Sequence, residues 1–239
     1  MKIISFGGGV NSVAMTIMLY KRGEIYPLVF ADTMAEHPET YCYMDYFERE
    51  FLSKYGQKIV RVNPFDNAEL YNKRMRNKSL EQYCLENKMI PLFHIRFCTS
   101  EFKRDPLQRY NKETHLIAFA WDERHRSKDN SKWDLEYPLI EERITRQGCI
   151  DIIQLEGLNI PRKSGCFFCP FQRIAEWENT WKFYPELFNR SLIMEENSKS
   201  TFRNDKNSLS VLRERFEAKG GDLFPDYDYE ELTPCMCIT

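Results

Sequence analysis

Apolar and polar positions alternate along the first third of the chain in blocks that predict strands followed by helices. A short apolar run at residues 2–6 ends at three glycines, and apolar residues are dense enough over 11–20 for a mostly buried helix. Residues 25–31 and 58–62 predict two more strands, and residues 38–55 predict a helix with a proline in its first turn. This order predicts the fold class α/β, with a Rossmann-like parallel sheet and helices on both faces.

The rest of the chain is less regular, and its character changes near residue 160. The elements expected there are a helix at 66–87, a strand at 115–121, a polar loop at 124–134 and helices at 145–156, 171–183, 185–199 and 207–218. We therefore expect two parts. Residues 1–160 contain the sheet and the glycine loop, and residues 161–239 form a mostly helical C-terminal region that carries a cysteine loop.

The composition excludes several classes of protein. The chain has 239 residues with 34 Lys and Arg against 36 Asp and Glu, and this balance argues against bulk electrostatic capture of nucleic acid. Its 17 Phe, 13 Tyr and 4 Trp provide ample core material, which argues against long disorder. The chain lacks the run of about 18 apolar residues that a membrane span needs, and its first residues do not form a secretion signal. We expect a cytoplasmic protein with no membrane partner.

The glycine loop that follows the first predicted strand is the first candidate site. Gly7, Gly8 and Gly9 let the backbone approach an anion closely, and the helix that follows offers free N–H groups and a positive dipole end. Asn11 or Ser12 is placed to cap that helix and to donate to a phosphate. The loop has no Gly-Lys-Ser/Thr, so it is not a Walker loop. A glycine-rich turn without a ligand is the alternative.

The cysteines provide the second candidate site. The chain has eight of them, and their spacing distinguishes candidate ligands from the others. Cys166 and Cys169 form a C-x-x-C unit, the spacing used for zinc or iron–sulfur coordination. Cys98 and one of Cys235 or Cys237 complete the best set of four ligands, because none of them lies on an obvious apolar face. A redox C-x-x-C, which normally opens a helix, and free thiols are the alternatives.

Several segments resemble one known family. The segment FGGGVNSVAM resembles the pyrophosphate-binding loop of the N-type ATP pyrophosphatases, whose usual form is SGGxDS; Gly7 replaces its serine and Asn11 its aspartate. Four later segments resemble the phosphoadenylyl-sulfate (PAPS) reductase branch of that group, and they read FADTMAEHPET, CTSEFKRDPL, YPLIE and KSGCFFCPFQ. The segment AFAWDERHR resembles a further motif, with Ala118 and Ala120 in place of its glycine and arginine.

The resemblance implies an adenine nucleotide alpha-hydrolase-like PP-loop domain over residues 1–160 that binds ATP with Mg²⁺. The residues it places near the nucleotide are Gly7, Gly8, Gly9, Asn11, Ser12, Asp32 and Thr33. The candidate catalytic residues are Asn11, Ser12 and Lys103, and Lys103 is suited to approach a phosphate or sulfate as a point charge. Relatives that transfer sulfur often carry a [4Fe-4S] cluster, so the expected ligands Cys98, Cys166, Cys169 and Cys237 hold a cluster rather than zinc.

The chain is similar to the ATP pyrophosphatase component of DNA phosphorothioation systems. This similarity implies an enzyme that cleaves ATP to AMP and pyrophosphate and adenylates an oxygen of the DNA backbone, which sulfur then replaces. The implied partners are a cysteine desulfurase as sulfur donor and DNA, which another subunit delivers. The alternatives are a PAPS or adenylyl-sulfate reductase, a tRNA-type thiolation enzyme and a non-catalytic nucleotide-binding scaffold. The ending PCMCIT lacks the Gly and His of the reductase cysteine motif, which disfavours the reductase.

Overall fold

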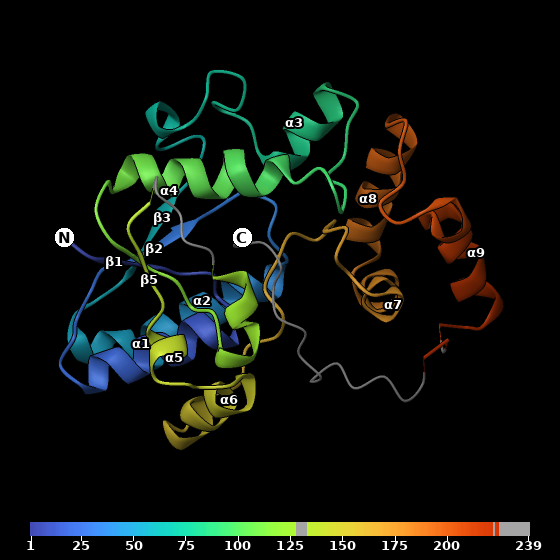
Figure 1. Cartoon of the computed structure of the whole chain (residues 1–239). Coiled ribbons are helices and arrows are strands. Elements are labelled where there is room, and N and C mark those ends of the chain that lie inside the picture. Colours follow the sequence, from blue (N-terminus) through green and yellow to red (C-terminus); the bar gives the residue numbers. More distant parts are fainter. Residues whose placement is uncertain (128–132, 222, 225–239) are drawn as a thin grey trace.

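A five-stranded parallel sheet forms the centre of the fold in the computed structural model, which describes residues 1–127, 133–221 and 223–224 (Figure 1). The strands are β1 (Ile3–Ser5), β2 (Leu28–Ala31), β3 (Ile59–Val62), β4 (His115–Leu116) and β5 (Leu135–Glu136). Their order is β3-β2-β1-β4-β5, so β1 lies in the middle and pairs through Ile4 with Leu28 on one side and Leu116 on the other. The predicted α/β class is confirmed.

Successive residues of each strand point to opposite faces of the sheet, and each face has its own core. Ile4 and Leu28 join one hydrophobic cluster, whereas their neighbours Ile3 and Val29 join the other. The helices that cover the first face are α1 (Val10–Lys21), α2 (Pro38–Glu50), α5 (Pro138–Glu141) and α6 (Arg146–Leu155). The second face is covered by α3 (Leu80–Glu86), the π-helix η3 (Cys98–Arg104) and α4 (Asp105–Tyr110). The fold therefore has three layers.

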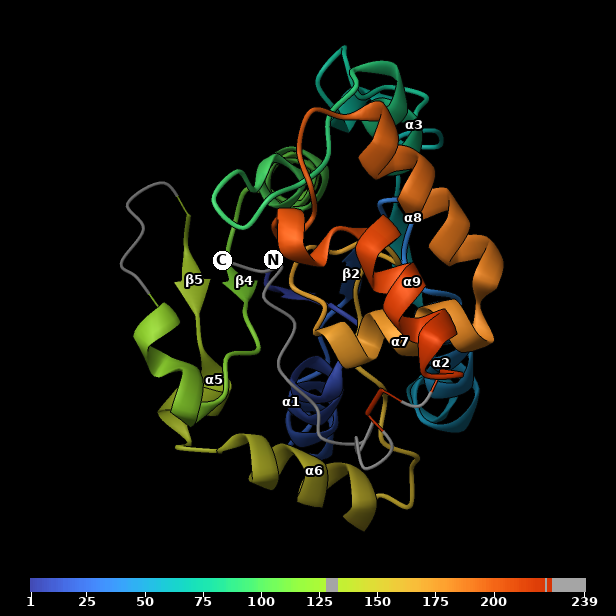
Figure 2. The same cartoon turned by 90° about the vertical axis from the view of Figure 1, so that its right-hand side faces the viewer.

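The C-terminal helices pack beside this sandwich rather than away from it (Figure 2). They are α7 (Ile174–Phe183), α8 (Pro185–Asn197) and α9 (Leu209–Ala218). Phe188 and Phe216 belong to the same hydrophobic cluster as Ile3 and Val29 of the sheet. The core of the described residues thus continues across residue 160, and the division into two domains there stays a prediction.

One predicted helix is wrong in extent. Residues 66–87 contain only the 3₁₀-helix η2 (Ala68–Leu70), a series of turns and the short helix α3. Asn77 has a positive φ of 56°, which a continuous α-helix does not accept. Ser79 then starts α3 with a capping box, in which its hydroxyl accepts from the N–H of Gln82. The apolar positions of this segment fill the core from turns as well as from a helix.

The segment expected as a strand over 115–121 is the second correction. Only His115 and Leu116 belong to β4, and the 3₁₀-helix η4 (Trp121–Arg126) follows where a polar loop was expected. Residues 117–119 are apolar because they line pockets at the sheet edge, not because they continue the strand. The predicted helix over 38–55 changes geometry at Phe51 (φ −120°, ψ −59°) and continues as the 3₁₀-helix η1 (Leu52–Tyr55).

The other predicted helices agree with the structure to within a few residues. Thr145 caps α6, and its hydroxyl accepts from the N–H of Gly148 at 3.2 Å. The π-helix η3 was not predicted. It runs into α4, where Pro106 has no N–H to donate to the carbonyl of Phe102, so regular α-helical bonding is interrupted at this junction. In the part of the chain that the structure describes, no helix has the length and apolar character needed to cross a membrane.

Candidate functional site

Three pockets lie along the carboxyl edge of the parallel sheet. In an open sheet of this kind, ligands bind where neighbouring crossover connections run in opposite directions, and here that point lies between β1 and β4. The first is the glycine-loop pocket, of about 480 Å³, lined by Gly7, Gly9, Asn11, Ser12 and residues after β4. The other two are the Trp133 pocket and the cysteine pocket.

The conformation of the glycine loop explains two of its three glycines, Gly8 and Gly9. Gly8 has a φ of +70°, and a Cβ there would lie 3.2 Å from Cγ2 of Thr40. A Cβ on Gly9 would lie 2.9 Å from Oγ of Ser164. Helix α1 starts directly after Gly9, and no side chain of the described residues caps it. Its first N–H groups and the positive end of its dipole are therefore available to an anion.

Neither Asn11 nor Ser12 caps α1, although both line the pocket. The Ser12 hydroxyl donates to the carbonyl oxygen of Gly9 at 2.9 Å. The amide of Asn11 donates to Oε2 of Glu123 at 2.6 Å and accepts from Nη1 of Arg146 at 2.8 Å. Glu123 also forms an ion pair with Arg126. Asn11 therefore ties the start of α1 to η4 and to the start of α6.

The charges around the glycine-loop pocket favour an anion. Arg126, Arg146 and Lys163 line it, and Glu123 is its one lining carboxylate among the described residues. The Arg126 guanidinium also lies over the ring of Phe119, 4.5 Å from the centroid. Glu123 is only 6% exposed, so these charges act in a poorly solvated environment where electrostatic interactions are strong.

The second pocket, of about 490 Å³, is largely apolar and is called here the Trp133 pocket. Phe6, Phe30 and Trp133 supply its aromatic surface, and Lys103 and Arg104 its charges. It shares Gly7 and Ile117 with the glycine-loop pocket. Aromatic walls of this kind suit a flat heterocyclic ring. Sequence reasoning missed this pocket, because its residues come from separate segments.

Asp32 and Thr33 lie just after β2, as predicted, but their side chains are bonded within the protein. Oδ1 of Asp32 accepts from the N–H of Met34 and from the hydroxyl of Tyr41, both at 2.7 Å. Burial raises the pKa of the Asp32 carboxyl. The hydroxyl of Thr33 donates to Oε1 of Glu36 at 3.0 Å. Their contact with a nucleotide stays a prediction.

The third pocket brings three of the predicted ligands together. Cys98, Cys166 and Cys169 line this cysteine pocket, which has a volume of about 290 Å³. Burial raises the pKa of the Cys98 thiol. Cys237 lies outside the described residues. Within the described residues, no group of three or more His, Cys, Asp or Glu side chains is arranged to hold a metal ion.

The C-x-x-C unit forms a turn rather than the start of a helix. The N–H of Cys169 donates to the carbonyl oxygen of Cys166 at 3.0 Å, which places both thiols on one short turn. Helix α7 begins only at Ile174. A redox C-x-x-C is usually acidified by the helix that it opens, so this geometry favours the metal-ligand interpretation over the redox alternative.

The remaining described cysteines do not line the pocket. Cys84 and Cys149 are buried, and burial raises the pKa of Cys149 to about 12. Both therefore agree with the structural role expected of an apolar thiol. Cys42, which the helical pattern predicts to be buried, is instead exposed on α2.

Glu36 is the site residue that sequence reasoning missed. Its carboxylate is almost fully buried, with 1% of the side chain exposed, and lies 2.8 Å from Nζ of Lys103. The thiol of Cys166 lies 3.5 Å from the same Oε1, and Cys166 and Glu36 are also paired in an isolated antiparallel bridge. Lys103 lines both the Trp133 pocket and the cysteine pocket. Its predicted place beside an anionic ligand stays a prediction, because in this structure its ammonium is paired with Glu36.

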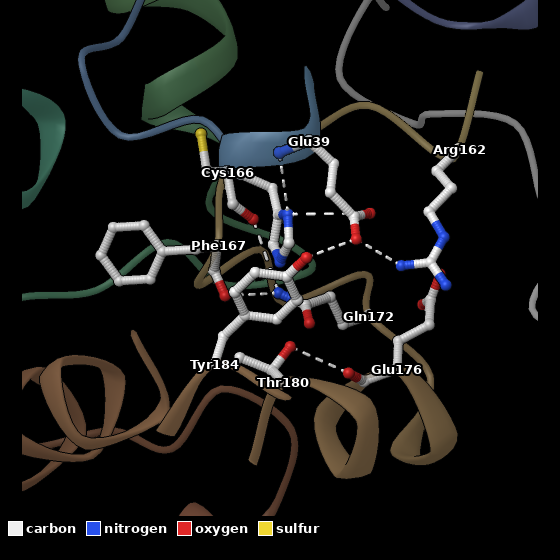
Figure 3. A network of polar contacts seen from close by, with 9 residues as sticks. Glu39, Arg162, Cys166, Phe167, Gln172, Glu176, Thr180 and Tyr184 are labelled. Atoms are coloured by element: carbon white, nitrogen blue, oxygen red, sulfur yellow. Dashed lines mark hydrogen bonds and ion pairs between the residues drawn. The ribbon is translucent and has the colours of Figure 1, made fainter. Parts of the chain in front are cut away.

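Polar contacts fix the cysteine loop against α2 and the C-terminal helices (Figure 3). Oε1 of Glu39 accepts from the hydroxyl of Tyr184 and from Nη1 of Arg162, both at 2.5 Å. The side-chain amide of Gln172 donates to the carbonyl oxygen of Phe167 at 2.7 Å. The C-terminal region therefore takes part in building the pocket edge.

Comparison with known proteins identifies the family of the chain. The chain is 25% identical over 205 residues to the uncharacterized protein MJ0973 of Methanocaldococcus jannaschii, an alignment that covers 78% of this chain and 45% of that protein. The chain thus spans less than half the length of this relative. Residues 2–130, more than half of the chain, match the phosphoadenosine phosphosulfate reductase domain. That range contains the glycine loop, Glu36, Cys98 and Lys103, and the chain belongs to the phosphoadenosine phosphosulfate reductase domain family.

Proposed function

We propose that the chain is an ATP pyrophosphatase that releases AMP and pyrophosphate and adenylates an oxygen, which sulfur then replaces. One observation carries this proposal. An uncapped helix start surrounded by Arg126, Arg146 and Lys163 adjoins a pocket whose aromatic walls suit an adenine ring. The two pockets share Gly7 and Ile117, as the two ends of one nucleotide require.

The base of ATP then occupies the Trp133 pocket and its β- and γ-phosphates occupy the glycine-loop pocket. Attack on the α-phosphorus by an acceptor oxygen breaks the bond to the α,β-bridging oxygen, and pyrophosphate leaves with the negative charge. The N–H groups at the start of α1, with Arg126 and Arg146, are already placed where that charge develops, so they lower the barrier without reorganisation.

Magnesium accompanies the nucleotide in this proposal. The oxygens of Asn11, Ser12 and Glu123 all line the glycine-loop pocket, and hard oxygen donors are those that Mg²⁺ prefers. They fit the ion as direct or water-mediated ligands. The ion supplies neutralisation of phosphate charge, while Asn11 orients both Glu123 and Arg146 through its amide.

The cysteine pocket offers three thiols, and on the sequence resemblance we expect them to hold a [4Fe-4S] cluster rather than zinc. A cluster is larger and is held by thiolates on separate irons. Cys98, Cys166 and Cys169 would hold it, with Cys237, outside the described residues, as the expected fourth ligand; when bound, it would supply a site for sulfur or electrons.

The acceptor that we propose is a phosphate oxygen of the DNA backbone, with sulfur from a cysteine desulfurase and DNA delivered by another subunit. These assignments rest on the sequence resemblance. Lys103 lines both the Trp133 pocket and the cysteine pocket. It therefore supports a link between ATP cleavage and sulfur transfer. No observation on the described residues favours the reductase alternative over this one.

The test is a product analysis with the anaerobically purified protein. Labelled ATP, Mg²⁺, a cysteine desulfurase with cysteine, and plasmid DNA or tRNA are incubated together, and nucleotides and pyrophosphate are quantified. The proposal predicts AMP and pyrophosphate in equal amounts, dependent on acceptor and lost in Arg146→Met but not in Lys54→Met, a surface control. Production of ADP, or thiol-dependent sulfite release from PAPS without ATP cleavage, contradicts it.

A further inference from the structure

The cysteine loop, defined as residues 161–170, belongs to two pockets at once. Lys163 and Ser164, in its first half, line the glycine-loop pocket. Cys166 and Cys169, in its second half, line the cysteine pocket. The family match ends at residue 130, so this loop lies outside the matched range. The structure adds to the sequence resemblance of this segment that its first half lines the glycine-loop pocket.

Ser164 lies directly against the phosphate-binding backbone. It is 4% exposed, and its Oγ would be 2.9 Å from a Cβ at position 9, closer than side-chain atoms normally approach. Gly9 is thus required partly because Ser164 occupies the adjoining space. A hydroxyl at this place, beside the uncapped start of α1, is suited to donate to a phosphate oxygen bound there.

Lys163 brings a positive charge to the same pocket from a fixed position. Its Nζ donates to the carbonyl oxygen of Phe171 at 3.1 Å and to Oε2 of Glu176 at 3.0 Å, and its side chain is 16% exposed. These two contacts hold the ammonium between the loop and α7. Because an ammonium has three N–H donors, it is able to donate to an anion in the pocket as well.

The loop connects the two pockets by a short and anchored piece of backbone. Only Gly165 separates Ser164 from Cys166 along the chain, a span of at most about 7 Å between their Cα atoms. The carbonyl oxygen of Gly165 accepts from the N–H of His37 at 2.8 Å, and the N–H of Phe167 donates to the carbonyl oxygen of Ala35 at 3.1 Å. A change of position at Cys166 or Cys169 is therefore transmitted to Ser164 and Lys163.

We propose that Lys163 and Ser164 bind the terminal phosphates of a nucleoside triphosphate, and that the cysteine loop thereby couples occupancy of the glycine-loop pocket to the state of Cys166 and Cys169. This inference rests on the proposed binding of ATP. By thermodynamic linkage, if modification of the thiols weakens phosphate binding, bound phosphate disfavours that modification by the same factor.

The first experiment measures ATP and AMP binding to the purified chain by calorimetry. Lys163→Met and Ser164→Ala are expected to weaken ATP binding by about tenfold or more for Lys163 and by a smaller factor for Ser164, as for hydrogen bonds to charged groups. AMP binding and the thermal midpoint are expected to change little, and Lys54→Met serves as the control. If the wild-type chain does not bind ATP, the proposed function fails; if it does and both variants bind ATP equally well, this inference fails.

The second experiment measures alkylation of individual cysteines by iodoacetamide, followed by mass spectrometry. The exposed thiol of Cys42 is the internal control. ATP is expected to slow modification of Cys169 by about fivefold or more, within the usual range of coupling, while AMP has little effect and Cys42 reacts at an unchanged rate. The slowing is expected to disappear in Lys163→Met and Ser164→Ala. Equal protection by AMP, or equal rates with and without ATP, overturns the coupling.

Discussion

The two ends of the candidate site are built in different ways. The glycine loop is one continuous stretch, residues 7–12, at the junction of β1 and α1. The cysteine pocket is assembled from α3, the π-helix η3 and the cysteine loop, with Glu36 behind it. A site made from one turn can be recognised in a sequence, whereas a site made from distant segments depends on the whole fold. The predictions below test this difference.

The largest expected loss of unfolding free energy concerns the cysteine pocket. Lys103→Met leaves the buried carboxylate of Glu36 without its ammonium partner, and breaking a buried ion pair from one side typically costs about 3–5 kcal/mol of unfolding free energy. Urea unfolding measures the loss. The matched control is Lys2→Met, whose pair with Glu136 is exposed and is expected to contribute less than about 1 kcal/mol. Equal losses in both variants would show that the Lys103–Glu36 pair is not effectively buried.

The next largest expected loss of unfolding free energy concerns the glycine-loop pocket. Asn11→Asp restores the residue usual in the resembled motif, but it replaces an amide donor 2.6 Å from Glu123 by a second carboxylate. The buried acceptor then lacks its donor, and we expect a loss of about 1–3 kcal/mol in unfolding free energy. Adding Glu123→Gln is expected to recover most of it in a double-mutant cycle. Additive losses would contradict the direct contact.

A smaller effect separates backbone strain from ligand binding. Gly8→Ala and Gly23→Ala both place a side chain at a positive φ, +70° and +81° respectively, and each is expected to cost about 1 kcal/mol or more. Gly23 has open space around it, whereas Gly8 lies in the glycine loop. ATP affinity, measured by calorimetry, is therefore expected to fall only in Gly8→Ala. A similar fall in both variants would refute the loop assignment.

The smallest expected effect is a pH dependence of unfolding free energy that comes from His37, whose N–H bonds to Gly165 of the cysteine loop. Burial lowers the pKa of His37 below its ordinary value of 6.5, so the unfolded chain binds a proton that the folded chain does not. Stability is therefore expected to fall as the pH is lowered from 6.5 toward the folded-state pKa, by at most about 1.4 kcal/mol per pH unit.

His37→Asn isolates this contribution. The substitution keeps an acceptor for the N–H of Glu39, which His37 caps at 3.4 Å, and removes the titrating ring. Thermal or urea unfolding between pH 5 and 7 is expected to show a shallower slope in the variant. An unchanged slope would assign the pH dependence to other groups.

The sequence was sufficient for the parts of the fold that repeat a local pattern. The alternation of strands and helices predicted the parallel sheet, and the glycines predicted the tight turn between β1 and α1, because a buried strand and a left-handed turn each restrict residue type locally. Thr145 similarly marks the start of α6. The helix over 66–87 was wrong because apolar residues in turns reach the core just as helical ones do.

The rest of the site depends on contacts between distant residues. Glu36 looks like an ordinary polar residue in FADTMAEHPET, and only the fold places it beside Lys103 and Cys166. Its position directly opposite Cys166 in an isolated bridge was not encoded by any local pattern. The sequence grouped Cys98 with Cys166 and Cys169 by chemistry, and the structure places all three around one pocket.

The central claim is that this edge of the sheet binds ATP through its terminal phosphates. Equilibrium binding of ATP, AMP and adenosine 3′,5′-bisphosphate to the purified chain, measured by calorimetry with Mg²⁺, tests it most directly. The account predicts that ATP binds about tenfold or more tightly than AMP, because the β- and γ-phosphates add charged hydrogen bonds, and more tightly than the bisphosphate. Equal affinities for ATP and AMP, or a preference for the bisphosphate, would contradict it.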